Sequence, residues 1–259
     1  MSTLSVSLIQ MNVRKGLPKS NWAVMQEYTA EASRRGAELV IFPELWDAGS
    51  AFDKGREIAS SLSGGLFAQV AALARQYNIH ILGSMYEKRG VGVHNTCPVI
   101  SPRNGVMGAY RKMHLFSMMG EDQWLIPGES PLSIDMPWGR MGLAICYDLR
   151  FPELFRRYAE EGVQVVVVPA AWPHPRQEHY RTLLRARAIE NQCYMIAVNR
   201  IGTDEDDGMS YFGHSSVIDP WGNVVLEGGE TEAHFTITID IDMVNEIRQQ
   251  FPVLEDRRL

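Results

Sequence analysis

Residues 141–168 read MGLAICYDLRFPELFRRYAEEGVQVVVV, in which two apolar segments flank a stretch with helical periodicity. We predict strands over 141–145 and 163–168 and a helix over 152–161, which starts with a proline, a residue suited to the first helical turn. Strand, helix and strand in this order form a βαβ unit, so the two strands are parallel neighbours in one sheet. Residues 165–168 are all valine, and we therefore expect this strand to be central and covered on both faces.

The rest of the chain continues the alternation of short strands and helices. The predicted strands are 4–11, 37–42, 79–86, 96–101, 108–110, 194–198, 215–218, 224–226 and 234–241, and the predicted helices are 21–35, 66–77, 176–191 and one near the C-terminus. A glycine-rich turn at 90–92 marks a hairpin, and residues 118–138 are expected to form a loop. No low-complexity linker divides the sequence, so we expect one α/β domain over residues 1–259.

Composition and charge exclude several classes of function. The 259 residues are 45% hydrophobic and 22% charged, and 31 acidic against 25 basic residues give a formal charge of −6. This balance argues against nucleic acid as a partner. No window approaches the ~20 apolar residues of a membrane span, and the N-terminus lacks the pattern of a signal peptide. We therefore expect a cytoplasmic protein that does not bind membranes.

Three cysteines are candidate free thiols, because a reducing cytosol disfavours disulfides. Cys97 lies within a predicted strand and Cys193 begins an apolar run, so both are interpreted as core residues. Cys146 differs, because it ends the strand 141–145 just before a tight turn and a helix. That arrangement presents a nucleophile beside backbone N–H groups. From the residues alone, a nucleophile and an inert thiol at a strand end both remain open.

The tetrapeptide Phe-Pro-Glu-Leu occurs twice, and the two contexts separate its glutamates. Glu44 follows the strand 37–42 and therefore lies at a carboxyl end, where α/β sheets place their ligand crevices. Glu153 falls in the first turn of a predicted helix, where a carboxylate stabilises the positive end of the helix dipole. We interpret Glu153 as structural, while Glu44 is either a surface turn residue or part of a site.

A basic segment, YRKMHLF at 110–116, directly follows a predicted strand. A solvated basic turn is one interpretation, since lysine and arginine are mostly exposed. The other is that Lys112 lies in a pocket, where its charge stabilises a thiolate and an oxyanion.

Metal and cofactor motifs are missing from the sequence. His174 and His179 are five residues apart, roughly 140° around a helix, and so do not share the face that a zinc pair requires. The glycines give neither a phosphate-binding loop nor a dinucleotide fingerprint. A papain-like cysteine and histidine pair is formally possible, but no local pattern singles out a histidine.

Three separated segments, FPELW at 42–46, YRKMHLF at 110–116 and ICYDLRFPE at 145–153, closely resemble the signature segments of the nitrilase (carbon–nitrogen hydrolase) superfamily. Their order and wide spacing match as well. Further likeness lies in LRARAIENQ at 184–192 and in DPWG at 219–222. The short loop around residue 121 looks most like the omega-amidase branch, since deaminated-glutathione amidases usually carry a longer insert there.

The resemblance implies a four-layer αββα sandwich of the nitrilase type that pairs into a homodimer. In this family the dimer commonly forms through the helices that flank the nucleophile strand, here 152–161 and 176–191. Asp148, Arg150, Arg187 and Glu190 are accordingly expected to be structural ion-pair residues.

The resemblance also assigns the site. The family's Glu, Lys and Cys triad falls on Glu44, Lys112 and Cys146, and its second active-site glutamate falls on Glu121. Tyr147 and Trp172 are expected to shape the substrate pocket, and no metal or organic cofactor is expected. Lys112 and the nearby helix N-terminus are expected to increase the thiolate fraction of Cys146.

The implied reaction is hydrolysis of the terminal amide of a small 2-oxo dicarboxylate monoamide to a carboxylic acid and ammonia, through a cysteine thioester. Deaminated-glutathione amidase, aliphatic nitrilase and carbamoyl-amide hydrolase are alternatives with the same triad. A catalytically idle dimeric scaffold is the alternative outside enzymes.

Overall fold

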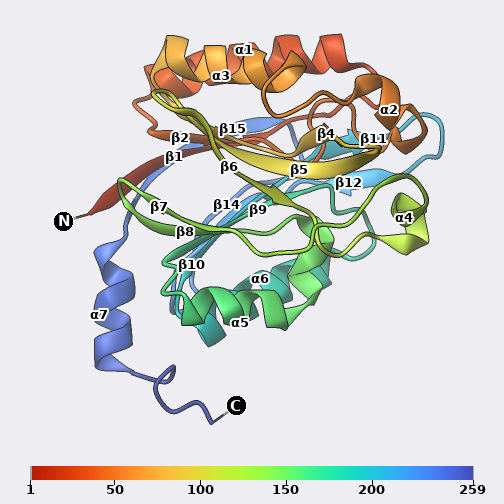
Figure 1. Cartoon of the computed structure of the whole chain (residues 1–259). Helices are drawn as coiled ribbons and strands as arrows, with labels where there is room; N and C mark the ends of the chain where they lie inside the picture. Colours follow the sequence, from red (N-terminus) through yellow and green to blue (C-terminus); the bar gives the residue numbers. More distant parts are fainter. Residues whose placement is uncertain (1, 259) are drawn as a thin grey trace.

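The computed structural model describes residues 2–258 (Figure 1). Met1 and Leu259, the two ends of the predicted domain, lie outside the described residues. The strands are β1 (Thr3–Gln10), β2 (Leu39–Ile41), β3 (His80–Leu82), β4 (Met85–Arg89), β5 (Gly92–Ser101), β6 (Gly105–Arg111), β7 (Ser133–Met136), β8 (Gly139–Leu143), β9 (Val165–Ala170), β10 (Tyr194–Asn199), β11 (Ile201–Thr203), β12 (Ser210–Phe212), β13 (Ser216–Ile218), β14 (Val224–Glu227) and β15 (Ala233–Asp240). The helices are α1 (Pro18–Arg34), α2 (Gly55–Ile58), α3 (Gly65–Tyr77), α4 (Glu121–Trp124), α5 (Pro152–Glu160), α6 (Gln177–Asn191) and α7 (Asp242–Gln250).

Two sheets pack face to face between two layers of helices. The first sheet has seven strands in the order β15-β1-β2-β3-β5-β4, with β6 paired to β5, and the second has six in the order β14-β13-β10-β9-β8-β7. Figure 1 shows α1 and α3 covering the outer face of the first sheet and α5 and α6 covering that of the second. The predicted αββα sandwich is therefore confirmed.

Side chains alternate between the two faces of a strand, so the first sheet contributes residues to two hydrophobic cores. In β1, Leu4, Val6 and Leu8 point to the core between the sheets, whereas Ile9 packs in the core beneath α1 and α3. Side chains alternate across a strand, so a β-strand that is apolar on both faces is stable only where both faces are covered.

The predicted βαβ unit is present as β8, α5 and β9. β8 pairs with β9 in parallel, and β9 lies between β8 and β10. The four valines at 165–168 are fully buried. This agrees with the prediction from the lack of polar residues in that run. Glu153 is exposed in the first turn of α5, in agreement with its structural interpretation.

The structure differs from the sequence prediction at several places, among them α2, β11 and β12, which were not predicted. The run 79–86 is two strands rather than one, because it is interrupted at Gly83, where φ is +149° and a Cβ would lie 2.7 Å from Phe42 Cβ. The loop predicted over 118–138 contains α4 and β7. Helix α1 begins at Pro18, three residues before the predicted start, with the proline in its first turn.

Within residues 2–258, no helix is both long and apolar enough to cross a membrane.

Candidate active site

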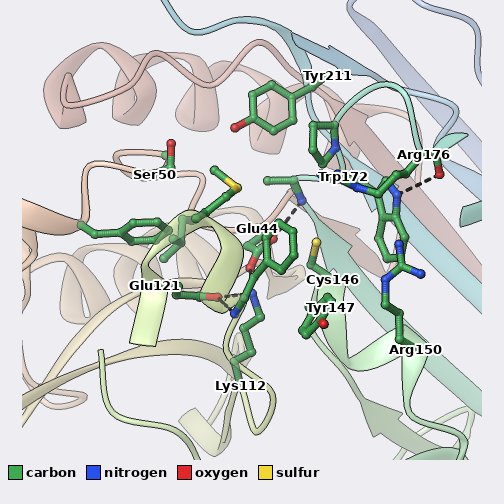
Figure 2. Close-up of a pocket in the computed structure, with 17 residues that line it drawn as sticks. Glu44, Ser50, Lys112, Glu121, Cys146, Tyr147, Arg150, Trp172, Arg176 and Tyr211 are labelled. Carbon is green, nitrogen blue, oxygen red and sulfur yellow. Dashed lines mark hydrogen bonds and ion pairs between the residues drawn. The ribbon is translucent and has the colours of Figure 1, made fainter. Parts of the chain in front are cut away.

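The four side chains predicted to form the site lie together although they are far apart in sequence. Glu44 follows β2, Lys112 follows β6, Glu121 begins α4, and Cys146 follows the end of β8. Figure 2 shows the four side chains converging on one pocket, which all of them line. The convergence arises because β2 and β8 belong to different sheets that face each other, so their carboxyl ends meet at one edge of the sandwich.

Cys146 adopts a backbone conformation that L-residues rarely take. Its φ is +45°, and it heads a 3₁₀ turn over Cys146–Arg150 that leads into α5. Asp148 stabilises this turn, because its Oδ2 accepts a hydrogen bond from the backbone N–H of Ile145 at 2.9 Å. Strained residues of this kind persist only where the surroundings impose them, and they concentrate at functional sites.

Lys112 is held between two buried carboxylates. Its Nζ lies 2.8 Å from Glu44 Oε1 and 2.7 Å from Glu121 Oε2, and the side chain is 3% exposed. Burial by itself would lower the pKa of Lys112, but the charges of Glu121 and Glu44 raise that pKa well above its ordinary value. The site therefore contains a permanent ammonium ion.

The thiol of Cys146 is not activated in the way the sequence predicted. Burial raises the pKa of Cys146 well above its ordinary value, and the Glu44 charge raises it further, while Lys112 lowers it by less. The expectation of an enlarged resting thiolate fraction is therefore wrong. A buried thiol beside a carboxylate is protonated at rest, and its proton must be removed by a base as the sulfur reacts.

A pocket lies in front of Cys146 and opens to solvent. The empty space inside it and at its open mouth is about 540 Å³. Its apolar walls are formed by Leu45, Phe52, Phe116, Met119, Trp172 and Pro173. Tyr147 and Trp172 both line the pocket, where the sequence analysis expected them.

Arg150 was predicted to form a structural ion pair, and this prediction is wrong. Its guanidinium lies 4.7 Å from the Trp172 ring centroid and donates to His179 Nδ1 at 3.3 Å, and the residue lines the pocket. Arg176 also lines the pocket, with its guanidinium 5.4 Å from the Phe116 ring centroid. Within the described residues neither arginine is paired with a carboxylate.

The other three predicted ion-pair residues are structural. Arg187 and Glu190 form an ion pair at 2.9 Å, as predicted. Asp148 is fully buried, but it accepts hydrogen bonds from Tyr110 and His114 and is not paired with an arginine.

Sequence reasoning missed Asn95 and Arg176 at this site. Asn95 lies in β5, is fully buried, and donates to Glu44 Oε1 at 2.8 Å. No local pattern distinguishes it from any other polar residue in a strand. Arg176 follows a proline-containing loop, and only the folding of that loop over Cys146 brings it to the pocket.

A base, an ammonium ion and a thiol meet in an otherwise apolar pocket, and this combination is suited to nucleophilic attack on a carbonyl carbon. The family model for carbon–nitrogen hydrolases matches residues 5–249. The chain belongs to the carbon–nitrogen hydrolase family. The predictions of family membership and of an enzyme that hydrolyses amide carbon–nitrogen bonds are thereby confirmed.

Individual relatives match over nearly the whole chain. A 2-oxoglutaramate amidase of Bacillus subtilis is 33% identical, with 98% of this chain and 97% of the relative covered. Omega-amidase NIT2 of Mus musculus is also 33% identical, with 100% and 96% covered. The crystal structure of XC1258 from Xanthomonas campestris, a CN-hydrolase superfamily protein, superposes with a TM-score of 0.91 at 31% identity, covering 100% of this chain and 98% of that one.

Proposed function

We propose that this protein is an omega-amidase, which hydrolyses the terminal amide of a small dicarboxylate monoamide such as 2-oxoglutaramate to the dicarboxylate and ammonia. The observation that carries the proposal is the pair of arginines, Arg150 and Arg176, in the same pocket as Cys146. The names of the Bacillus and mouse relatives support the same substrate class.

The charges in the pocket favour one orientation of such a substrate. Around Lys112, two carboxylates face one ammonium ion, so this end repels a second anion. Arg150 lies on the other side of Cys146 from Lys112 and Glu121 (Figure 2). A substrate carboxylate therefore binds at the arginines by charge-assisted hydrogen bonds, and the amide points toward the thiol.

The first half of the proposed reaction forms a thioester. The Cys146 sulfur attacks the amide carbon while Glu44 takes the thiol proton. The charge that develops on the carbonyl oxygen is stabilised by Lys112 and by the backbone N–H of Tyr147, near the start of the 3₁₀ turn. Glu44 then gives its proton to the nitrogen, the C–N bond breaks, and ammonia leaves.

The second half hydrolyses the thioester. A water molecule gives a proton to Glu44 and attacks the thioester carbon, the C–S bond breaks, and Glu44 returns the proton to the sulfur. Glu121 holds Lys112 in place throughout and orients the leaving nitrogen. Tyr147 and Trp172 form the wall against which the substrate chain lies. No step in this scheme uses a metal or an organic cofactor.

A screen for ammonia release tests the proposal, with 2-oxoglutaramate, 2-oxosuccinamate, deaminated glutathione, short aliphatic amides and nitriles as substrates. The sharpest comparison is succinamate against butyramide, because they differ only by a carboxylate in place of a methyl group. We expect a higher kcat/KM for succinamate by about 10- to 100-fold, the value of one or two hydrogen bonds between charged groups. Equal values would contradict the proposal, and preference for deaminated glutathione or a nitrile would replace it.

We also propose that the protein is a homodimer that pairs through α5 and α6. Ile189 of α6, Trp221 and Phe251 are apolar yet 50%, 49% and 53% exposed. The Trp221 and Phe251 rings stack at 6.2 Å, and a Cβ on Gly222 would lie 2.5 Å from Ile189, so these exposed side chains adjoin one another. Adjoining exposed apolar side chains are typical of an interface.

Light scattering after size exclusion tests the dimer. Ile189→Asp should give monomers, because it places a charge in the interface. Val91→Asp is the matched control, since Val91 is 95% exposed in the turn between β4 and β5. A monomeric wild-type protein would contradict this proposal.

We further propose that the protein works in the cytoplasm. Its three cysteines are free thiols, and a thiol nucleophile stays reduced most readily in a reducing compartment. Cell fractionation with an antibody to the protein tests this location.

A further inference from the structure

The buried amide of Asn95 contacts both carboxylates of the site. Its Nδ2 donates to Glu44 Oε1 at 2.8 Å and to Glu121 Oε1 at 3.2 Å. An amide NH₂ group has two hydrogens, so both are used. The reverse orientation would aim the amide oxygen at two carboxylate oxygens, which repel it, so the neighbours determine which way the amide points.

The backbone of Asn95 also positions Lys112. The carbonyl oxygen of Asn95 accepts a hydrogen bond from the backbone N–H of Lys112 at 2.9 Å, which extends the pairing of β5 with β6 past the end of β6. One residue thus contacts Glu44 and Glu121 through its side chain and Lys112 through its main chain.

The hydrogen bonds distinguish the two oxygens of Glu44. Oε1 accepts from Lys112 at 2.8 Å and from Asn95 at 2.8 Å, which occupies both of its lone pairs. Oε2 accepts from the backbone N–H of Ala171 at 3.0 Å, which uses one of its two lone pairs. One lone pair of Oε2 is therefore available to a proton.

We propose that Asn95 is a positioning residue of this active site, which saturates Glu44 Oε1 and so makes Oε2 the atom that exchanges protons with the thiol, the leaving nitrogen and water. The inference rests on the proposed roles of Glu44 and Cys146. Asn95 does not line the pocket, so it acts on the substrate only through the two carboxylates.

The chemistry of the position explains why a neutral donor is required there. Two carboxylates and one ammonium ion already leave an excess negative charge, and an aspartate would increase it. A second cation would compete with Lys112 for the carboxylates. An amide stabilises the ionised form of Glu44 by hydrogen bonding without changing the net charge.

Asn95→Leu, which has a similar volume but no donor, tests the proposal. Loss of a donor to the ionised base should move the acidic limb of the kcat/KM profile for succinamate to higher pH by about one unit. kcat should fall about 10- to 100-fold, the effect of one hydrogen bond to a charged group, while KM stays unchanged. Asn95→Ser should show the same shift of the acidic limb to higher pH. This variant replaces Asn95→Leu in the experiment if the leucine variant does not fold.

Thr96→Val is the matched control. Thr96 is the next residue of β5, is also fully buried, and donates to Glu87 at 2.7 Å rather than to the site. This variant should lose similar stability but keep the wild-type pH profile. If the profile and kcat of the Asn95 variants coincide with those of Thr96→Val, the proposal is overturned and Asn95 is structural only.

A readout without substrate separates this inference from the proposed function. The pH dependence of Cys146 alkylation by iodoacetamide reports on the base that removes the thiol proton. The Asn95 variants should shift its acidic limb in the same direction, even if the wild-type protein releases no ammonia from any amide in the screen. An unshifted alkylation profile would overturn the inference in that case as well.

Discussion

The Asp148 carboxylate accepts a hydrogen bond from His114 Nδ1 at 2.7 Å, and it thereby joins the segment that carries Lys112 to the turn that carries Cys146. The same carboxylate accepts from the backbone N–H of His114 at 3.0 Å and from the Tyr110 hydroxyl at 2.7 Å. The segment that carries Lys112 and the turn that carries Cys146 are thus connected by hydrogen bonds to one fully buried carboxylate.

Asp148→Ala should lower the free energy of unfolding by about 3 kcal/mol or more, because it leaves several buried donors without an acceptor. Urea denaturation at pH 7 measures this loss. Tyr110→Phe removes only one of the donors and should cost about 1 kcal/mol. If Asp148→Ala were no more destabilising than Tyr110→Phe, the role given to Asp148 would be wrong.

Cys146→Ala should abolish ammonia release without loss of the fold, because it removes the proposed nucleophile and leaves only a small gap at the pocket. Iodoacetamide should label one thiol per wild-type chain and none in this variant. Cys97 and Cys193 are buried away from the pocket that Cys146 lines, and within the described residues neither thiol is hydrogen-bonded to a base such as Glu44, so neither should react. Cys193→Ala is the control and should keep both the label and the activity. Turnover by Cys146→Ala would exclude the thioester.

Arg150→Leu and Arg176→Leu should each raise KM for succinamate about 10- to 100-fold, the effect of a lost charge-assisted hydrogen bond. KM for butyramide should not change, because butyramide has no carboxylate. Steady-state kinetics with both substrates measures the difference. Arg75→Leu, on the exposed side of α3, should leave both values as in the wild type. Parallel changes for the two substrates would mean that the arginines only shape the pocket.

Asp47→Asn should make stability less dependent on pH. Burial raises the pKa of Asp47 from 3.8 to about 7 in the folded protein. Between these values the folded protein holds a proton that the unfolded chain has released, so wild-type stability falls as the pH rises from about 4 to 7. The difference in free energy of unfolding between the variant and the wild type should therefore move in favour of the variant by up to about 4 kcal/mol across that range.

Denaturant titrations at pH 4.5, 6 and 8 measure this gain. Asp53→Asn changes an exposed aspartate and should show no such trend. A constant difference between Asp47→Asn and wild type at all three pH values would contradict the assigned cause.

The prediction succeeded where neighbours along the chain decide the structure. The apolar run before Cys146, the tight turn and the proline that begins α5 lie within a dozen residues, and β8, α5 and β9 formed where the pattern indicated. The strand 79–86 was predicted as one because its residues favour strands throughout. The contact of Gly83 with Phe42 and Trp46, about forty residues earlier in the chain, interrupts it.

The catalytic roles of Glu44, Lys112, Cys146 and Glu121 stay predictions, but their convergence is a property of the fold. Sequence resemblance named these four positions from motifs. It assigned Arg150 to a structural ion pair because the residue lies next to the helices expected at the dimer interface. Only the packing of Trp172 against its guanidinium revealed its place in the pocket.

The sequence by itself determined the strand, turn and helix around Cys146 and the chemical types of the groups in the site, because bonding and sterics between close neighbours control both. Only the tertiary structure decided which of those groups meet and in what protonation state. Asn95 reaches Glu44 because β5 and the end of β2 lie in one sheet, and the pKa of the Cys146 thiol is raised because folding removes water from it. The long-range contacts and the burial of the polar groups in the site arise from packing the two sheets together, and no local pattern encodes either of them.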